Sequence, residues 1–367
     1  MSESRGPGSE RCFSCAVAGI ESLKTKKDKA PLAENSERLE PEQIAEICEK
    51  IFSLPVEKVT APGGKSRVSF RVHFPGKSII ATQRIYPGRM RMEVEVLKRL
   101  SELGAPVPKY LGGTEQLFFQ EDVGSKRLTS TMRQESAIGQ LALAENTFES
   151  LLRIHTAAAK ADLAAVVPAL GENESWVRGL INSSLTVADR YGTDHPQLDM
   201  DALTARLTVP ATRFIKWDSR PGNGSIGADG QVYWFDWEHC GRRQGMEDFA
   251  WLAGDEFWPL GPEVVVPILE YLLPAADKAV ELAYLTDFIT FHMVQRLQLI
   301  HLRFMAAGWV NVADAMKYDK VGVDPQLAKN LCARGAAWAD RSTLTRPMTA
   351  FFQDCAAAVD GFGRSES

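Results

Sequence analysis

The chain has 367 residues, with 42 Lys and Arg against 47 Asp and Glu and a formal net charge of −5. Nucleic-acid-binding proteins usually carry a basic surplus, so this balance argues against that class. Apolar residues make up 45% and charged residues 24%, which argues against a wholly disordered or fibrous chain and predicts one large domain or two smaller lobes. No stretch approaches the roughly 18 apolar residues of a membrane helix. We therefore expect a soluble protein whose partners include neither nucleic acid nor membrane.

The first 40 residues have the composition of a disordered tail, since residues 22–41 are polar, charged and free of aromatic side chains. Six cysteines are scattered along the chain, too few for a disulfide framework, which favours a cytoplasmic location. Cys12 and Cys15 form a CxxC. Because no second pair of ligands follows, ordinary tail cysteines are the favoured interpretation, and a zinc or redox site is the less favoured one.

Residues 41–123 are predicted to form a small, β-rich N-terminal lobe that binds nucleotide. Apolar residues at helical spacing predict helices over 41–52 and 89–103. Alternation of apolar and polar residues predicts two strands, over 67–74 and 78–85, joined by a turn at 75–77. A further short strand is expected at 117–120.

Beyond Gly124 the pattern changes to a mainly helical C-terminal lobe, residues 124–367, which is predicted to carry the catalytic and metal-binding loops. Helical patterns cover 137–159, 201–207, 262–307 and 325–359. Two short strands, 213–217 and 231–237, are expected to pair as a hairpin within this lobe. The fold class predicted is α+β with two lobes.

Segment 214–251 carries the most informative spacing. Asp218 and Asn223 stand five residues apart on a loop after a strand, and Asp236 follows thirteen residues later. Phosphoryl transfer needs a carboxylate that orients or deprotonates the acceptor hydroxyl, and oxygen ligands for the metal that holds the polyphosphate. A hairpin of this length would return Asp236 beside Asn223, so that both contact one magnesium ion.

These residues resemble the aminoglycoside phosphotransferase and choline kinase family, which are relatives of the protein kinases. KWDSRPGN at 216–223 is similar to the family's catalytic loop HGDLHPGN, and FDWEHC at 235–240 to its metal motif IDFxxA or IDWExA. PGGKSRVSFRV at 62–72 is similar to GGxTNxxYRV, and FFQEDVGSKRL at 118–128 to the segment that links the lobes. Over roughly residues 56–260, the resemblance implies a protein-kinase-like fold that uses ATP and Mg²⁺.

The resemblance assigns roles residue by residue. It implies that Asp218 is the catalytic base or orienting group and that Arg220 stabilises charge. The implied metal ligands are Asn223, Asp236 and Glu238, although Glu238 is equally well explained as a solvated loop acid. It implies that Asp248, in the family's trailing DLA position, is an acid that fixes the catalytic loop. The implied nucleotide contacts are Gly63, Gly64, Ser66, Arg67, Arg84, Glu93, Gln120, Glu121 and Val123.

Two departures from the family's pattern bear on activity. The strand that should end in a phosphate-binding lysine paired with Glu93 reads ATQRI, so Arg84 or Gln83 occupies that position. Arginine keeps the charge and binds phosphate through a fork, whereas glutamine would leave the phosphates without this cation. In the catalytic loop, Lys216 and Trp217 replace the usual His-Gly.

The resulting hypothesis is a kinase that transfers the γ-phosphate of ATP to a hydroxyl of a small molecule. A cationic acceptor is among the candidates, because DEFWP at 255–259 and the nearby Trp251 supply acids and aromatic rings; Trp251 and Phe257 fit a helix core better. One alternative is a degenerate kinase that binds nucleotide without catalysis. A kinase acting on protein side chains is disfavoured, since no APE-like segment precedes Pro262. The acceptor, the choice of ATP or GTP and the oligomeric state stay open.

Overall fold

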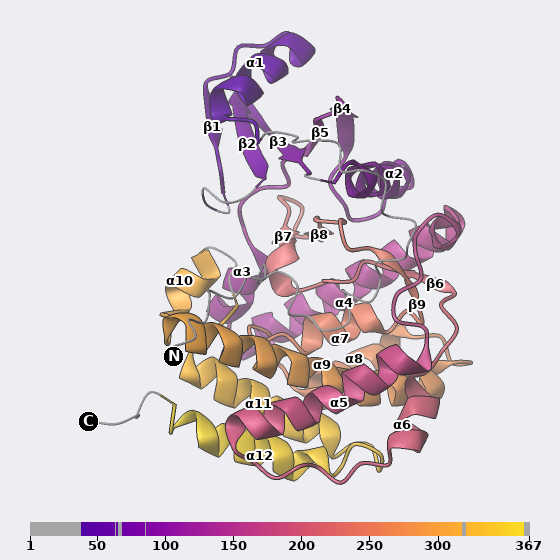
Figure 1. Ribbon diagram of the computed structural model, residues 1–367. Helices are drawn as coiled ribbons and strands as arrows, with labels where there is room; N and C mark the ends of the chain where they lie inside the picture. The colour runs from indigo at the N-terminus through magenta and orange to yellow at the C-terminus, as the bar shows by residue number, and fades with distance from the viewer. Residues whose placement is uncertain (1–37, 63, 65–67, 85, 318–320, 363–367) are drawn as a thin grey trace, which may run out of the picture.

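The fold is described from a computed structural model of the chain, for residues 38–62, 64, 68–84, 86–317 and 321–362. The expected disordered tail, including Cys12 and Cys15, lies outside the described residues apart from its last three positions, as do Gly63, Ser66 and Arg67. The described part forms a small N-terminal lobe around an antiparallel sheet and a larger, mainly helical C-terminal lobe (Figure 1). This two-lobed α+β architecture confirms the predicted fold class.

The small lobe is a five-stranded sheet with a helix at either side. In spatial order its strands are β1 (Lys58–Thr60), β2 (Ser69–Phe74), β3 (Lys77–Gln83), β5 (Leu117–Glu121) and β4 (Tyr110–Gly113). Its helices are α1 (Pro41–Phe52) and α2 (Pro87–Glu102). Alternate residues of β2 are buried, and Phe70 and Val72 pack with Ile44 and Cys48 of α1 in a core of their own. The alternation that predicted the strand is thus the pattern that seats α1 on one face of the sheet.

The larger lobe is built around helices. In chain order these are α3 (Leu128–Gln134), α4 (Ala137–Lys160), α5 (Glu174–Tyr191), α6 (Met200–Leu207), α7 (Glu247–Ala253), α8 (Pro262–Leu272), α9 (Lys278–Ala307), α10 (Val312–Lys317), α11 (Pro325–Ala339) and α12 (Met348–Val359). The middle of α9 is buried, with α5, α7 and α11 packed on it. Among the described helices, none is both long enough and apolar enough to cross a membrane.

Helix α2 packs against strand β4 of the small lobe and against helix α4 of the larger lobe. Its buried Val96, Leu97 and Leu100 belong to the same core as Phe148 and Leu151 of α4. The helix therefore connects the two lobes, and a side chain on it can contact residues of both.

The hairpin predicted between segments 213–217 and 231–237 is wrong. Strand β6 (Arg213–Ile215) pairs instead with β9 (Gly241–Arg243), and a separate hairpin is formed by β7 (Gly224–Ile226) and β8 (Val232–Trp234). The chain leaves the extended conformation after Ile215, because Trp217 and Asp218 have φ angles of 49° and 54°. Gly230, with a φ of 79°, closes the shorter hairpin, where a residue without Cβ adopts this angle without strain. In Figure 1, β7 and β8 lie on the side of the larger lobe that faces the sheet.

Candidate active site

The loop after β6 is held in an unusual conformation by one buried carboxylate. Asp248, at the start of α7, accepts hydrogen bonds from the backbone N–H groups of Lys216 and Trp217, each at 2.8 Å. The hydroxyl of Ser219 donates to the backbone oxygen of Asp248 at 2.6 Å. His155 Nε2 lies 2.7 Å from Asp248 Oδ2. Asp248 is fully buried, and these contacts hold the loop after β6, the loop that the resemblance expects it to fix.

Replacing Asp248 should therefore destabilise the fold. We expect Asp248→Ala to lower the free energy of unfolding by about 3 kcal/mol or more, because the substitution leaves two buried N–H groups without an acceptor, and each such group costs about 1–3 kcal/mol. Urea denaturation followed by circular dichroism measures this loss. Asp340→Ala is the matched control, since Asp340 is an exposed acid that pairs with Arg346 on the surface. Equal stability of the two variants would contradict this role of Asp248.

Asn223 is oriented by the neighbouring Asp218. Its Nδ2 donates to the backbone oxygen and to Oδ2 of Asp218, both at 2.9 Å. With both amide hydrogens used in this way, Asn223 Oδ1 remains as an acceptor for another group. The N–H of Phe235 donates to the backbone oxygen of Asn223 at 3.2 Å, which holds the residue before Asp236 beside Asn223. The predicted neighbourhood of Asn223 and Asp236 thus exists, although the β7–β8 hairpin creates it.

The cation at the end of β3 is Arg84, and it joins the two lobes. Arg84 Nε and Nη2 donate to the two carboxylate oxygens of Glu93 on α2 at 2.7 and 2.9 Å, and Nη2 also donates to Asp236 Oδ1 at 2.7 Å. Gln83 points to the other face of the sheet, where its amide oxygen accepts from the N–H of Leu39 at 3.1 Å. Arg84, and not Gln83, is therefore the residue that pairs with Glu93, which decides between the two alternatives that the sequence left open.

Burial and neighbouring charges shift the pKa values of Arg84 and Glu93 in opposite directions. Burial alone would lower the pKa of the Arg84 guanidinium, but the carboxylates of Asp236 and Glu93 outweigh that effect and raise its pKa. Burial raises the pKa of the Glu93 carboxyl, and the charge of Arg84 acts against that rise. Glu93 also accepts from the N–H of Trp237 at 3.1 Å. The ion pair with Arg84 and this hydrogen bond keep a fully buried carboxylate satisfied.

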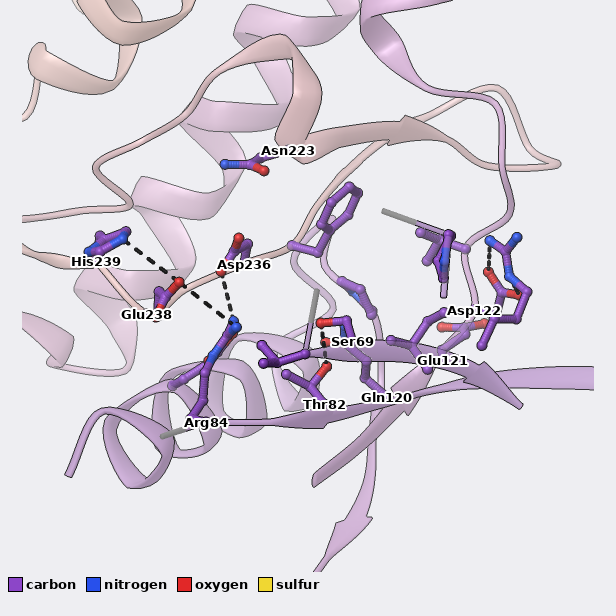
Figure 2. A pocket seen from close by; sticks show the side chains of 18 of the residues that line it. Ser69, Thr82, Arg84, Gln120, Glu121, Asp122, Asn223, Asp236, Glu238 and His239 are labelled. Atoms are coloured by element: carbon purple, nitrogen blue, oxygen red, sulfur yellow. Dashed lines mark hydrogen bonds and ion pairs between the residues drawn. The ribbon is translucent and has the colours of Figure 1, made fainter. Parts of the chain in front are cut away.

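A cavity of about 500 Å³ opens between the lobes in front of Arg84 (Figure 2). On the side of the small lobe it is lined by Ile80, Thr82 and Arg84, alternate residues on one face of β3 and its continuation. Asn223 and Asp236 line it from the larger lobe. Figure 2 shows Arg84 extending from the sheet toward Asp236, with Asn223 beyond it. Three of the residues expected to contact phosphates or metal, Arg84, Asn223 and Asp236, thus face one space.

The segment that links the lobes lines the far end of the same cavity. Gln120, Glu121 and Val123, the residues expected to contact the nucleotide, all contribute to its wall. Sequence reasoning missed how this segment is fixed: Asp122 accepts from Ser78 at 2.6 Å and forms an ion pair with Arg71 at 2.6 Å. Its pKa is lowered, because these hydrogen bonds and the charge of Arg71 outweigh the effect of burial.

Three predicted residues, Asp218, Arg220 and Gly64, lie outside the described wall of the cavity, and Asp218 is linked to it by its hydrogen bond with Asn223. The side chain of Arg220 forms an ion pair with the fully buried Asp255, at 2.7 Å, and does not contribute to the described wall of the cavity. Gly64 has a φ of 92° and its N–H donates to the backbone oxygen of Ala61 at 3.0 Å, so it forms a turn, also outside that wall.

Glu238 does line the cavity. It lies 3.8 Å from Arg84 and 4.0 Å from Arg89, with 26% of its side chain exposed. Within the described residues, no three His, Cys, Asp or Glu side chains come close enough together to hold a metal ion by themselves. A metal at this place would therefore depend on the Asn223 amide oxygen and on oxygens of a ligand in addition to Asp236 and Glu238.

The suggestion that DEFWP receives a cationic acceptor is wrong. Asp255 and Glu256 are 0% and 1% exposed, and Glu256 is bound by both Arg296 Nε and Nη2 at 2.8 Å. Trp251 and Phe257 are also buried, which agrees with the favoured interpretation as core. These acids balance buried arginines, so they have no surface from which to attract an acceptor.

Comparison with known proteins gives a structural match without a sequence match. No protein-family model and no curated protein matches the chain. Spectinomycin phosphotransferase, solved in complex with ADP and spectinomycin, aligns with a TM-score of 0.51 at 11% identity, covering 77% of this chain and 94% of that one. Choline kinase from Streptococcus pneumoniae aligns with a TM-score of 0.45 at 16% identity, covering 80% and 99%. The first alignment shows that the chain has the two-lobed, protein-kinase-like fold of that structure, which agrees with the predicted fold.

Proposed function

We propose that the protein is an ATP-dependent phosphotransferase that phosphorylates a hydroxyl of a small molecule. The observation that carries this proposal is the convergence of Arg84, Asn223 and Asp236 on one cavity, with Asp218 hydrogen-bonded to Asn223. A volume of about 500 Å³ lies in the usual range for a cofactor or ligand site. The free cysteines of the described part are buried, which is compatible with the proposed cytoplasmic location.

The residues present fit a magnesium ion bound together with a nucleotide. Mg²⁺ prefers hard oxygen ligands and is typically held by one or two carboxylates together with substrate phosphates. Asp236, the Asn223 amide oxygen and Glu238 supply such oxygens, and Arg84 supplies a cation for phosphate. When bound, Mg²⁺ neutralises the charge of the phosphates. The backbone of residues 120–123 would contact the nucleobase.

Asp218 is assigned to the acceptor hydroxyl. Its carboxylate would orient that hydroxyl and accept its proton, while the amide of Asn223 fixes the carboxylate in place at 2.9 Å. Arg220 would contribute positive charge behind the loop, held there by Asp255 at 2.7 Å. The charge of Arg220 would act on the phosphates through space, so this role requires no contact between Arg220 and the nucleotide.

A nucleotide-binding protein without catalytic activity is the second candidate. One observation favours it: Arg84 Nη2 lies 2.7 Å from Asp236 Oδ1, an oxygen that the kinase assignment gives to the metal. A protein that keeps this ion pair would bind nucleotide through Arg84 without depending on magnesium. Magnesium dependence therefore separates the two candidates.

The test is thermal stabilisation by ATP with and without magnesium. A ligand at 100 times its Kd stabilises the native state by about 2.7 kcal/mol, which corresponds to about 3–4 °C in Tm for a chain of this size. We expect this shift with Mg-ATP and a much smaller one with ATP and EDTA. Asp236→Asn should lose the magnesium-dependent part. The matched control Asp229→Asn changes an acid on the exposed turn of the same β7–β8 hairpin and should keep it.

The other outcomes decide between the candidates. A shift of equal size without magnesium, unchanged in Asp236→Asn, would favour the non-catalytic nucleotide-binding protein. Absence of a shift with ATP and with GTP would contradict both candidates.

A further inference from the structure

A buried lysine connects the two loops that carry the candidate catalytic residues. Lys216 is 0% exposed, and its Nζ donates to the backbone oxygen of Asp236 at 2.8 Å and to that of Asp218 at 3.4 Å. The same Nζ lies 5.2 Å from the centre of the Trp237 ring. One side chain therefore contacts the backbone of the proposed base and the backbone of the proposed metal ligand.

The two residues that Lys216 holds are backbone outliers. Asp218 and Asp236 have φ angles of 54° and 66°, and Trp217 between Lys216 and Asp218 has 49°. Within the described residues, these are three of the five non-glycine residues with a positive φ. Such conformations cost about 1–3 kcal/mol each and persist only where the surrounding structure enforces them. The ammonium group of Lys216 bonds to the carbonyl groups of two of the three.

A buried lysine at position 216 is energetically unfavourable compared with an apolar core residue. No carboxylate oxygen within the described part lies within ion-pair distance of its Nζ, so its charge is balanced by two carbonyl dipoles and the face of Trp237. Burial of a cation without an ionised partner is unfavourable, and an apolar residue of similar volume would pack there at lower cost. The position is therefore poorly explained by stability alone.

We infer that Lys216 is a positioning residue that sets the catalytic loop and the metal loop relative to each other. It acts through the backbone of Asp218 and Asp236, so that their carboxylates are held at a fixed separation, Asp236 in the wall of the cavity and Asp218 next to Asn223. This inference rests on the proposed function for the roles of the two carboxylates, whereas the mechanical link between the loops does not depend on it.

The test is amide hydrogen exchange of the ligand-free protein, followed by mass spectrometry, with Lys216→Met. Methionine keeps an unbranched side chain of similar length but removes the donor. We expect at least tenfold faster exchange in peptides that cover residues 216–224 and 234–240, with the rest of the chain unchanged. The Tm should stay within about 4 °C of wild type, while the magnesium-dependent shift in Tm caused by ATP should fall to less than half.

Arg334→Met is the matched control. Arg334 is also a buried cation of the larger lobe whose nitrogen donates to a backbone oxygen, that of Asp255, at 2.8 Å, and it contacts neither loop residue. Its loss should leave exchange of the two segments unchanged. If Lys216→Met does not fold, Lys216→Gln, which keeps a shorter and uncharged donor, should give the same local pattern.

Three results separate the possible failures. Unchanged exchange in both segments would overturn the inference about Lys216. Faster exchange across the whole lobe with a large fall in Tm would also overturn it, since Lys216 would then be a general structural residue. Faster exchange confined to the two segments, in a protein whose wild type shows no ATP shift, would support the link between the loops and contradict the proposed function instead.

Discussion

Asp218→Asn should lower phosphoryl transfer by about 10²–10⁴-fold, the usual contribution of a positioned general base. An amide at this position keeps an oxygen that can accept from Asn223 Nδ2, which lies 2.9 Å from Asp218 Oδ2, but it cannot accept the proton of the acceptor. The loop should therefore keep its conformation, and Mg-ATP should stabilise the variant as it does the wild type. ADP release with a set of small hydroxyl compounds as acceptors measures the rate.

The control for this prediction is Asp194→Asn, which changes an exposed loop acid of the same lobe and should leave the rate unchanged. An undiminished rate in Asp218→Asn would contradict the assignment of the base. Weaker Mg-ATP binding in the same variant would show that Asp218 contributes to the nucleotide site, which the kinase assignment does not predict.

The candidate site could be located from the sequence because its parts lie close together along the chain. Asp218, Asn223 and Asp236 fall within one short segment, and the structure brings Asn223 into contact with Asp218 and beside Asp236. The acid that fixes the loop, Asp248, follows soon after them. Such local spacing survives the error in strand pairing, since the tight β7–β8 turn and the expected longer hairpin both return Asp236 to Asn223.

Pairing of very short strands could not be predicted in the same way. Strands β6, β7, β8 and β9 have three residues each, too few for the alternation of side chains to specify a partner. Backbone angles determine which strands pair. The left-handed residues after Ile215 end β6, so β6 does not continue into a hairpin with residues 231–237. A tryptophan with a φ of 49° gives no signal of this in the sequence.

A different reason applies to α5, which was missed although its signal is present. The buried residues Val177, Leu180, Ile181, Ser184, Val187 and Ala188 follow helical spacing, and Asn173 caps the helix by accepting from the N–H of Trp176. Polar residues interrupt the apolar stripe, which weakens the pattern. The helix forms because it packs on α9, a contact between segments far apart in the chain.

Contacts between residues far apart in the chain explain why the positions of Arg220, Arg84 and Gln83 could not be predicted from the sequence. Arg220 and Asp255 are 35 residues apart in the chain, and only the tertiary structure shows that they form an ion pair. The choice between Arg84 and Gln83 is similar, because neighbouring residues of a strand point to opposite faces and a shift of one residue exchanges them. The contact of Gln83 with Leu39 and that of Arg84 with Glu93 settle which face each takes.

Arg84→Met should have the largest effect on both stability and nucleotide binding. Arg84 is the ion-pair partner of Glu93, whose side chain is 2% exposed, and removal of one partner of a buried ion pair typically costs about 3–5 kcal/mol. Loss of the cation should also abolish the shift in Tm caused by Mg-ATP. Urea denaturation measures the first effect and thermal stabilisation the second. Arg99→Met is the control, because Arg99 pairs with Glu95 on the surface of the same helix.

The pH dependence and a double variant show whether Glu93 is the cause. Burial raises the pKa of Glu93, and Arg84 opposes that rise, so removal of Arg84 should raise this pKa further. A carboxyl whose pKa is raised by folding destabilises the native state as the pH increases through that value. The loss in Arg84→Met should therefore be larger at pH 8 than at pH 5. In Arg84→Met/Glu93→Leu the stability should largely recover while nucleotide binding stays lost. A loss independent of pH, or recovery of both properties, would contradict this account of the Arg84–Glu93 pair.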